Sequence, residues 1–322
     1  RVAGQSPGEE RAGLRPEAVE RVLGAQPGLD RVAAPLNVVL SQRIASRVAE
    51  VVRPTVVADL FAIVAAARRS GRSISVAGGR HSMGTQQFGT GALQIDITGL
   101  DRVLELDVQG GLVTVEAGIM WPALIAELHR RQVDDPHPWT IREKQTGVDD
   151  VTLAGSLSSN VPGRSLARPP FVTDIEAFEI VDAAGRLMTC SRTENTDLFR
   201  LAIGGYGLFG IIARVTLRLE RRFKARRDVQ IIQVADLPGG YRERITAGYR
   251  FGDCQYSIDL TCAPESHPGV FACYRPVDDD TPVTARPVEL SRQDWADLYR
   301  LIRSDKSAAF QKYADHYRRT DG

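Results

Sequence analysis

The sequence predicts an α+β protein built from two domains. Its first half alternates short β-rich runs with segments of helical period and ends in a meander of short strands. Three tracts rich in glycine and other small residues interrupt this pattern. The composition changes abruptly after Arg218, because five of the seven residues 221–227 are basic. We therefore expect an N-terminal extension over residues 1–44, a first domain over residues 45–222 and a second domain over residues 223–322.

Length, composition and charge point to a protein that acts on a small molecule. With 322 residues, 43% of them hydrophobic, the chain can bury a large core. Its formal charge of +1 provides no field that would attract nucleic acid or an anionic membrane. No apolar run approaches the roughly 18 residues of a membrane span, and no signal-peptide pattern opens the chain. We expect a soluble and cytoplasmic protein, although a targeting segment could precede Arg1, which is not a Met.

The cysteines and aspartates do not indicate a metal site. Cys190, Cys254, Cys262 and Cys273 form no C-x-x-C pair and have no histidine pattern of the kind that binds zinc. We expect buried free thiols, with one disulfide among the last three cysteines as the alternative. The run Asp278–Asp280 precedes Thr281 and Pro282, so we interpret it as a solvated turn.

The elements of the first domain follow an extension in which only Pro16–Leu23 has a helical pattern. A strand around residues 48–52 leads to a helix that begins with Thr55 as its N-cap and ends at Gly71 as its C′ residue. The apolar residues Val57, Leu60, Phe61, Val64 and Ala65 form one face of that helix. Further strands are expected over residues 73–76, 93–97, 103–107 and 112–116, and a second helix over residues 121–131.

The second domain is expected to contain strands over residues 229–234, 255–259 and 270–275, followed by one long aromatic-rich helix over residues 294–317. We interpret the basic run at residues 221–227 as a solvated linker between the domains rather than as a binding patch. The terminal helix has no element after it that returns to the first domain. Its aromatic face would need a partner surface, so we expect the C-terminal part of this domain to be missing from the sequence.

The first glycine tract, residues 73–84, is a β-rich run that opens into a turn carrying a histidine. Gly78 and Gly79 permit positive φ angles and let backbone N–H groups approach an anion, while Arg80, His81 and Ser82 add side-chain donors on the same bend. The turn can therefore hold a phosphate beside a reactive imidazole. The alternative is an ordinary β-turn.

The second tract runs from Thr146 to Gly163 and is dominated by small side chains. Small residues from Ala154 to Ser159 leave room for a planar ring, and their hydroxyl and N–H groups can form hydrogen bonds with it. A short small-residue helix packed closely on a sheet explains the same composition equally well.

The third tract contains a literal G-x-G-x-x-G at Gly205, Gly207 and Gly210. A dinucleotide-binding fingerprint of the Rossmann type must follow a strand and open a helix. Here Val215, Leu217 and Leu219 alternate with polar residues, which is the period of a strand. The glycines therefore lead into a strand, and we reject the Rossmann interpretation.

Taken in order, the three tracts over residues 45–220 resemble the FAD-linked oxidases of the vanillyl-alcohol oxidase type, also called PCMH-type flavoproteins. This resemblance implies a two-part FAD-binding domain followed by an α+β substrate or cap domain, which would be incomplete here. It implies that FAD is bound, and that the His81 side chain is covalently bonded to the flavin. The cofactor-contacting positions that it implies are Ala77, Gly78, Gly79, Arg80, His81, Ser82, Met83, Gly147, Thr152, Gly155, Ser156, Ser159, Gly163 and the backbone of Ile212. Many relatives have His-Gly where this chain has Pro162-Gly163, so a histidine contact there is absent.

The resemblance implies oxidation of a hydroxylated small molecule by hydride transfer to flavin N5, with O₂ as one possible acceptor. No cysteine lies between Gln145 and Arg164, so a doubly attached flavin is not expected. The sequence gives no general base that we can name, although Glu143 and Lys144 could face the flavin ring. Two alternatives remain: a reductase of the same fold that holds FAD non-covalently, against which His81 argues, and a flavin-binding protein without turnover.

Overall fold

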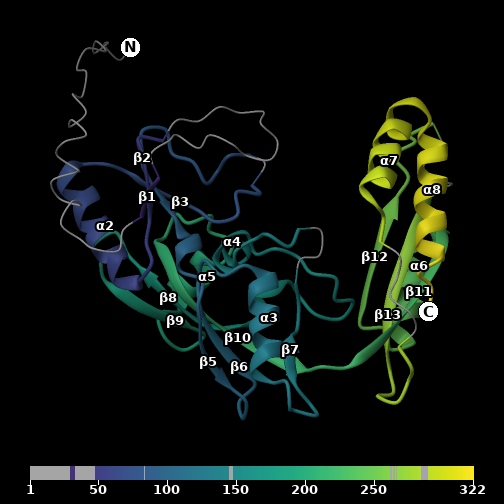
Figure 1. The fold of residues 1–322 in the computed structure, drawn as a ribbon, viewed down its shortest axis with the longest axis horizontal. Helices are drawn as coiled ribbons and strands as arrows, with labels where there is room; N and C mark the ends of the chain where they lie inside the picture. The colour runs from purple at the N-terminus through teal and green to yellow at the C-terminus, as the bar shows by residue number, and fades with distance from the viewer. Residues whose placement is uncertain are drawn as a thin grey trace, which may run out of the picture. The chain divides into compact units, whose positions relative to one another are not determined.

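The fold is described from a computed structural model that covers residues 30–32, 48–82, 84–144, 148–261, 263, 265, 267–283 and 289–322. The described chain divides into two compact units, and each is α+β, as predicted (Figure 1). Unit 1 contains the described residues up to Arg130, with Val148–Val161 and Asp174–Arg218. Unit 2 contains the described residues of the range 131–147, with Pro162–Thr173 and Leu219–Gly322. The expected boundary at residues 222 and 223 stays a prediction. Met83, Gly147, Cys262 and nearly all of the expected extension lie outside the described residues.

The first sheet of unit 1 has the strand order β1-β2-β4-β3. Its strands are β1 (Asp30–Val32), β2 (Glu50–Arg53), β3 (Ile74–Ala77) and β4 (Leu93–Asp96). Strand β4 pairs in parallel with both β2 and β3. Strands β2 and β3 therefore run in the same direction on either side of β4, and helix α2 (Val57–Ser70) is the crossover that connects them. The carboxyl ends of β3 and β4 therefore lie side by side, with Ala77 opposite Asp96.

The two ends of α2 test the capping predictions. Gly71 is the C-cap in the left-handed region at φ 65°, as predicted. The prediction that Thr55 is the N-cap is wrong, because the N-cap is Val56. The carboxylate of Asp59 accepts the backbone N–H groups of Thr55 (2.9 Å) and Val56 (3.1 Å), so an acidic residue in the first turn stabilises this end without a polar N-cap side chain.

The second sheet is antiparallel, with strand order β5-β6-β10-β8-β9. It consists of β5 (Val103–Asp107), β6 (Leu112–Glu116), β8 (Ile175–Val181), β9 (Leu187–Ser191) and β10 (Ile211–Arg221), and β7 (Trp139–Ile141) pairs with the far end of β10. The helices α3 (Trp121–Arg131), α4 (Leu153–Ser159) and α5 (Thr196–Ala202) connect these strands, with single 3-10 turns at Ile97–Gly99 and Phe171–Asp174. The bounds of β5, β6 and α3 are those predicted.

Unit 2 is built on a three-stranded antiparallel sheet in the order β11-β13-β12. The strands are β11 (Lys224–Gln233), β12 (Phe251–Tyr256) and β13 (Pro268–Val277), and a 3-10 turn at Val234–Asp236 leads into helix α6 (Leu237–Thr246). A small core of Ile232, Tyr249, Phe271 and Cys273 packs with Tyr241 of α6, whose ring meets that of Phe271 edge-on at 4.9 Å. The Cys273 side chain is fully buried in this core, and burial raises the pKa of its thiol to about 12.

Two expectations for the start of unit 2 are wrong. The basic run is not a linker, because Arg221 ends β10 and Lys224 begins β11, so only two residues separate the strands. Strand β12 begins at Phe251 rather than Gln255, because its pairing with β13 over Phe251–Tyr256 sets its bounds. Its sequence does not alternate between apolar and polar residues, so the local pattern did not show where the strand begins.

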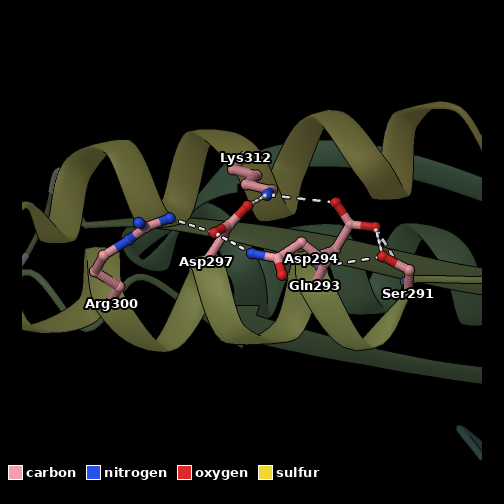
Figure 2. Close-up of polar contacts among 6 residues, drawn as sticks. All are labelled: Ser291, Gln293, Asp294, Asp297, Arg300 and Lys312. Carbon is pink, nitrogen blue, oxygen red and sulfur yellow. Dashed lines mark hydrogen bonds and ion pairs between the residues drawn. The ribbon is translucent and has the colours of Figure 1, made fainter.

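The expected single terminal helix is also wrong. It is a hairpin of α7 (Arg292–Ser304) and α8 (Lys306–Arg318), broken at Asp305, which is the C-cap of one helix and the N-cap of the other. The Asp305 carboxylate accepts the N–H of Ala308 at 2.9 Å, and this local bond competes with continuing the helix. Figure 2 shows Lys312 of α8 between Asp294 and Asp297 of α7, at 3.4 Å from an oxygen of each.

The chain also returns to the sheet of unit 2 after α8. The backbone N–H of Gly322 donates to the carbonyl of Arg227 (2.8 Å), and the Asp321 carboxylate accepts the N–H of Val229 (2.7 Å). These two hydrogen bonds attach the terminal segment to β11 within unit 2.

Three further expectations concern metals, thiols and membranes. No group of His, Cys, Asp or Glu residues in the described part of the chain could hold a metal ion. Residues 278–281 form a turn in which the N–H of Thr281 donates to the carbonyl of Asp278 (3.0 Å). Cys190, Cys254 and Cys273 are free thiols, and Cys190 and Cys273 are buried. No helix among the described residues is long and apolar enough to cross a membrane.

Candidate functional site

The first glycine tract forms a bend at the carboxyl end of β3. Ala77 is buried at the strand end, and Gly78 and Gly79 follow with negative φ angles; the left-handed residue is Arg80, at φ 61°. The Arg80 guanidinium pairs with the carboxylate of Asp96 at 3.3 Å. That carboxylate also accepts the N–H of Thr98 at 3.1 Å. The Arg80 side chain therefore attaches the bend to β4. The backbone of the bend remains available to contact a ligand.

The two glycines are needed because the second tract approaches them closely. An ideal Cβ on Gly78 would lie 2.1 Å from Oγ1 of Thr152, and one on Gly79 would lie 1.9 Å from the carbonyl oxygen of Asp150. Neither glycine has the positive φ that the sequence analysis allowed for. Close approach of two backbones, rather than backbone conformation, requires glycine here.

The second tract is the short small-residue helix α4, which was the alternative interpretation of its composition. Thr152 is its N-cap, and the Thr152 hydroxyl accepts the N–H of Gly155 at 3.2 Å. The Ser156 hydroxyl is fully buried and accepts the indole N–H of Trp121 at 3.0 Å. Because Thr152 and Ser156 are buried, they fix the helix in place, whereas Gly155 and Ser159 are partly exposed.

The third tract crosses the carboxyl end of α4. The backbone N–H groups of Gly204 and Tyr206 donate to the carbonyls of Leu157 and Ser158, both at 3.0 Å. Gly204, Gly207 and Gly210 have positive φ angles, and the chain then enters β10 at Ile211. The glycines therefore lead into a strand, as predicted. The backbone of Ile212 lies in this strand, opposite Ile180 of β8.

The structure thus brings the three tracts together around α4 within unit 1. The first tract lies against residues 150–152, and the third lies against residues 157–160. Two observations suit a phosphate-containing, hydroxyl-rich cofactor at this place. The backbone N–H groups of Gly79, His81 and Ser82 donate to no other described residue. The amide oxygen Oδ1 of Asn160 is buried and lacks a hydrogen-bond partner among the described residues, so it can accept a hydrogen bond from a ligand.

Gly163 belongs to unit 2 and lies against Glu143. An ideal Cβ on Gly163 would lie 1.8 Å from Oε1 of Glu143, which accepts the N–H of Ser165 at 2.8 Å. Glu143 is buried, with 6% of its surface exposed. The lack of a side chain at Gly163 therefore leaves the space that the Glu143 carboxylate occupies.

The sequence analysis missed Asp96, Asp150 and Asn160. Asp96 and Asp150 act through contacts between segments far apart in the chain, which no local pattern reveals. Asn160 had a local signal, because it follows a run of small residues and asparagine is common at left-handed helix ends; it has φ 44°.

Comparison with known proteins connects this arrangement with a cofactor. Residues 48–191 match a sequence family described as "FAD binding domain". This range contains the first and second glycine tracts and most of unit 1.

Several curated proteins are similar to about half of the chain. The chain is 30% identical over 171 residues to the L-gulonolactone oxidase of Mus musculus. The aligned segment covers 53% of this chain and 37% of that protein. The chain is 31% identical over 180 residues to the L-gulono-1,4-lactone dehydrogenase of Mycobacterium tuberculosis H37Rv, covering 56% of this chain and 40% of the other. The chain is also 30% identical over 194 residues to cytokinin dehydrogenase 4 of Oryza sativa subsp. japonica. That alignment covers 57% of this chain and 35% of the relative. The similar part of the chain therefore spans two fifths or less of each of these relatives.

Proposed function

We propose that this protein acts as an FAD-dependent oxidoreductase on a small molecule that bears a hydroxyl group, because residues 48–191 match the FAD binding domain family. The observation that carries this proposal is the convergence of three glycine tracts around α4, with backbone N–H groups of the bend available to a ligand. The similar proteins are oxidases and dehydrogenases by name, which supports the reaction class.

The bend after β3 is proposed to bind the pyrophosphate of FAD. Its available N–H groups would donate to the phosphate oxygens, as in other anion-binding bends built from backbone amides. The Arg80–Asp96 ion pair keeps the Arg80 side chain directed toward β4, so Arg80 would act mainly by fixing the bend. When bound, FAD would supply a hydride acceptor for oxidation of the substrate's C–H bond.

Two further positions around α4 would complete the cofactor site. The buried Oδ1 of Asn160 would accept a hydrogen bond from an O–H or N–H group of the cofactor. Gly155 would leave room for the cofactor beside the first turn of α4, where Thr152 and Val151 are the described residues that lie within 4 Å of its Cβ position.

We propose in addition that His81 is the covalent anchor of the flavin. His81 follows the bend directly and is partly exposed, so its imidazole is accessible beside the phosphate-binding N–H groups. Acid precipitation of the purified protein tests this: a covalent flavin stays with the precipitate, and a non-covalent one appears in the supernatant.

The matched variants are His81→Ala and His129→Ala, since His129 is also in unit 1 but lies on the exposed face of α3. The wild type and His129→Ala should retain yellow colour in the precipitate, whereas His81→Ala should release all its flavin. Release of all flavin from a yellow wild-type protein would disprove the covalent link and leave FAD binding intact. A protein that cannot be loaded with FAD would disprove both.

A further inference from the structure

One group of charged side chains in unit 2 carries more positive than negative charge. Arg226 and Asp228 of β11 are two positions apart and so lie on one face of the sheet, and Arg275 of β13 lies opposite Arg226 in the antiparallel register. Arg244 of α6 reaches the same place, because it lies 3.7 Å from the Asp228 carboxylate. Three guanidinium groups therefore share one carboxylate, and the excess is two positive charges (three minus one). We call these four residues the arginine cluster.

The cross-strand pair of arginines is unfavourable by itself. Like charges directly opposite each other on neighbouring strands repel. Asp228 compensates in part: its Oδ1 accepts the Nε–H of Arg226 at 3.1 Å, whereas the Nε of Arg275 lies 3.5 Å from its Oδ2. The Nε atom of Arg275 is buried and has no hydrogen-bond partner among the described residues. The repulsion is therefore only partly relieved, and a buried donor is available to an acceptor on a ligand.

The third guanidinium is fixed before any ligand binds. Nη1 of Arg244 donates to the hydroxyl of Tyr249, and Nη2 donates to Oε1 of Gln230 at 3.0 Å. The guanidinium also lies over the Tyr249 ring, 4.6 Å from its centroid. The Tyr249 hydroxyl in turn donates to the Asp228 carboxylate. These contacts hold the positive charge of Arg244 and the carboxylate of Asp228 in fixed positions.

The other two guanidinium groups are accessible from solvent. The side chains of Arg226 and Arg275 are 45% and 41% exposed. Their terminal nitrogens, Nη1 and Nη2, donate to no other residue in the part of the chain that the structure describes. Guanidinium groups bind phosphate through paired N–H···O bonds, and a phosphate monoester carries a charge of about −1.5 to −2 at neutral pH, which matches the excess. A carboxylate would leave one positive charge uncompensated.

From these observations we propose that the arginine cluster binds a phosphate group, either as the free ion or as the monoester of a small molecule. Arg226 and Arg275 would donate to the phosphate oxygens from neighbouring strands. Arg244 would contribute its charge from beside Asp228. All four residues belong to unit 2, so this binding would not require FAD.

Calorimetric titration of the whole 322-residue chain at low salt measures the binding. The probes are inorganic phosphate, glycerol 3-phosphate and acetate. Inorganic phosphate should bind at least about tenfold more tightly than acetate, because it carries a second negative charge and accepts more charged hydrogen bonds. Equal binding of glycerol 3-phosphate would identify a phosphate monoester as the ligand, and binding of inorganic phosphate alone would identify the free ion.

Two variants connect the binding with the cluster. Arg275→Gln removes a charge and the buried Nε–H, and it should weaken inorganic phosphate about tenfold or more. Arg275→Lys keeps the charge but loses the paired N–H groups, so its affinity should lie between those of Arg275→Gln and the wild type. The matched control is Arg303→Gln, which removes the same charge from an exposed position of α7 and should bind phosphate like the wild type.

Thermal unfolding separates a ligand site from a structural ion pair. In phosphate-free buffer, Arg275→Gln should raise the midpoint of unfolding, because it removes the repulsion between the two arginines. Phosphate at millimolar concentration should raise the midpoint of the wild type and of Arg303→Gln, but not that of Arg275→Gln.

A lower midpoint of Arg275→Gln in phosphate-free buffer would show that Arg275 acts mainly as an ion-pair partner of Asp228, and it would overturn the proposal. Phosphate binding no tighter than acetate binding would overturn it as well. The same holds for phosphate binding that is equally tight in Arg275→Gln and the wild type, because the phosphate would then bind elsewhere.

Discussion

At the scale of single residues, the glycines of this chain serve two different needs. Gly71, Gly204, Gly207 and Gly210 take positive φ angles that other residues adopt only with strain. Gly78 and Gly79 have ordinary φ angles, and their missing side chains make room for the backbone and the capping hydroxyl of the second tract. The site therefore depends on close contact of two chain segments at these positions.

Gly79→Ala should reduce stability and flavin loading together. The new Cβ would lie 1.9 Å from the carbonyl oxygen of Asp150, so one of the two backbone segments must move. Overpacking of this kind costs about 1–3 kcal/mol of the free energy of unfolding, which chemical denaturation measures.

The control for this substitution is Gly239→Ala in α6, where the nearest atom to the new Cβ is 4.0 Å away and φ is not positive. It should be neutral or slightly stabilising, because alanine favours a helix over glycine. Equal stability of Gly79→Ala and the wild type would show that the two tracts are not in contact.

At the scale of elements, ion pairs connect the two helices of the terminal hairpin. Lys312 of α8 lies 3.4 Å from the carboxylates of both Asp294 and Asp297 (Figure 2). The pKa of Asp294 is lowered mainly by its hydrogen bond with Ser291, and the pKa of Asp297 mainly by its hydrogen bond with Gln293; Lys312 lowers both further. Exposed ion pairs contribute little each, so the hairpin should be weakened but not abolished by loss of Lys312.

Lys312→Met should therefore increase amide hydrogen exchange in α8 at neutral pH, with Lys306→Met as the control outside the ion pairs. Because both folded-state carboxyl pKa values are lowered, the contribution of the pairs is present above the ordinary value of 3.8 and is lost as the pH falls through the lowered values. The difference between Lys312→Met and the wild type should shrink in that acidic range and in high salt. A difference that persists under both conditions would mean that Lys312 acts through packing instead.

At the scale of the whole molecule, the chain divides into two compact units, and the candidate cofactor site around α4 lies in unit 1. The sheet of β1–β4 lies in unit 1 and the sheet of β11–β13 lies in unit 2, and each unit has buried hydrophobic residues. A change that disturbs α4 should therefore leave the fold of unit 2 intact.

Gly155→Val tests this separation. Its Cβ would lie 3.0 Å from Oγ1 of Thr152, and the added methyl groups would disturb the N-cap and occupy the space proposed for the cofactor. We expect loss of flavin and faster hydrogen exchange in unit 1, while peptides of β11–β13 and α6 exchange as in the wild type. Normal flavin content in this variant would place the cofactor elsewhere, and faster exchange throughout unit 2 would contradict independent units.

Where local signals were sufficient, the sequence predicted the elements to the residue. Residues 103–107, 112–116 and 121–131 have a clear period and are bounded by Gly, Asp or a turn, so β5, β6 and α3 were found with correct bounds. Likewise, the alternation of residues 215–219 was enough to reject a Rossmann interpretation of the third tract.

The amino-acid sequence by itself determined the α+β class, the three glycine tracts and the similarity of residues 48–191 to an FAD binding domain, because each of these depends on local composition and residue order. Tertiary structure alone decided that β12 begins at Phe251, that Asp305 breaks the terminal helix and that Glu143 lies against Gly163. These features depend on contacts between residues distant in the chain or on competition between a local cap and helix propagation. The free energies involved are too small and too context-dependent for a local pattern to show which arrangement is favoured.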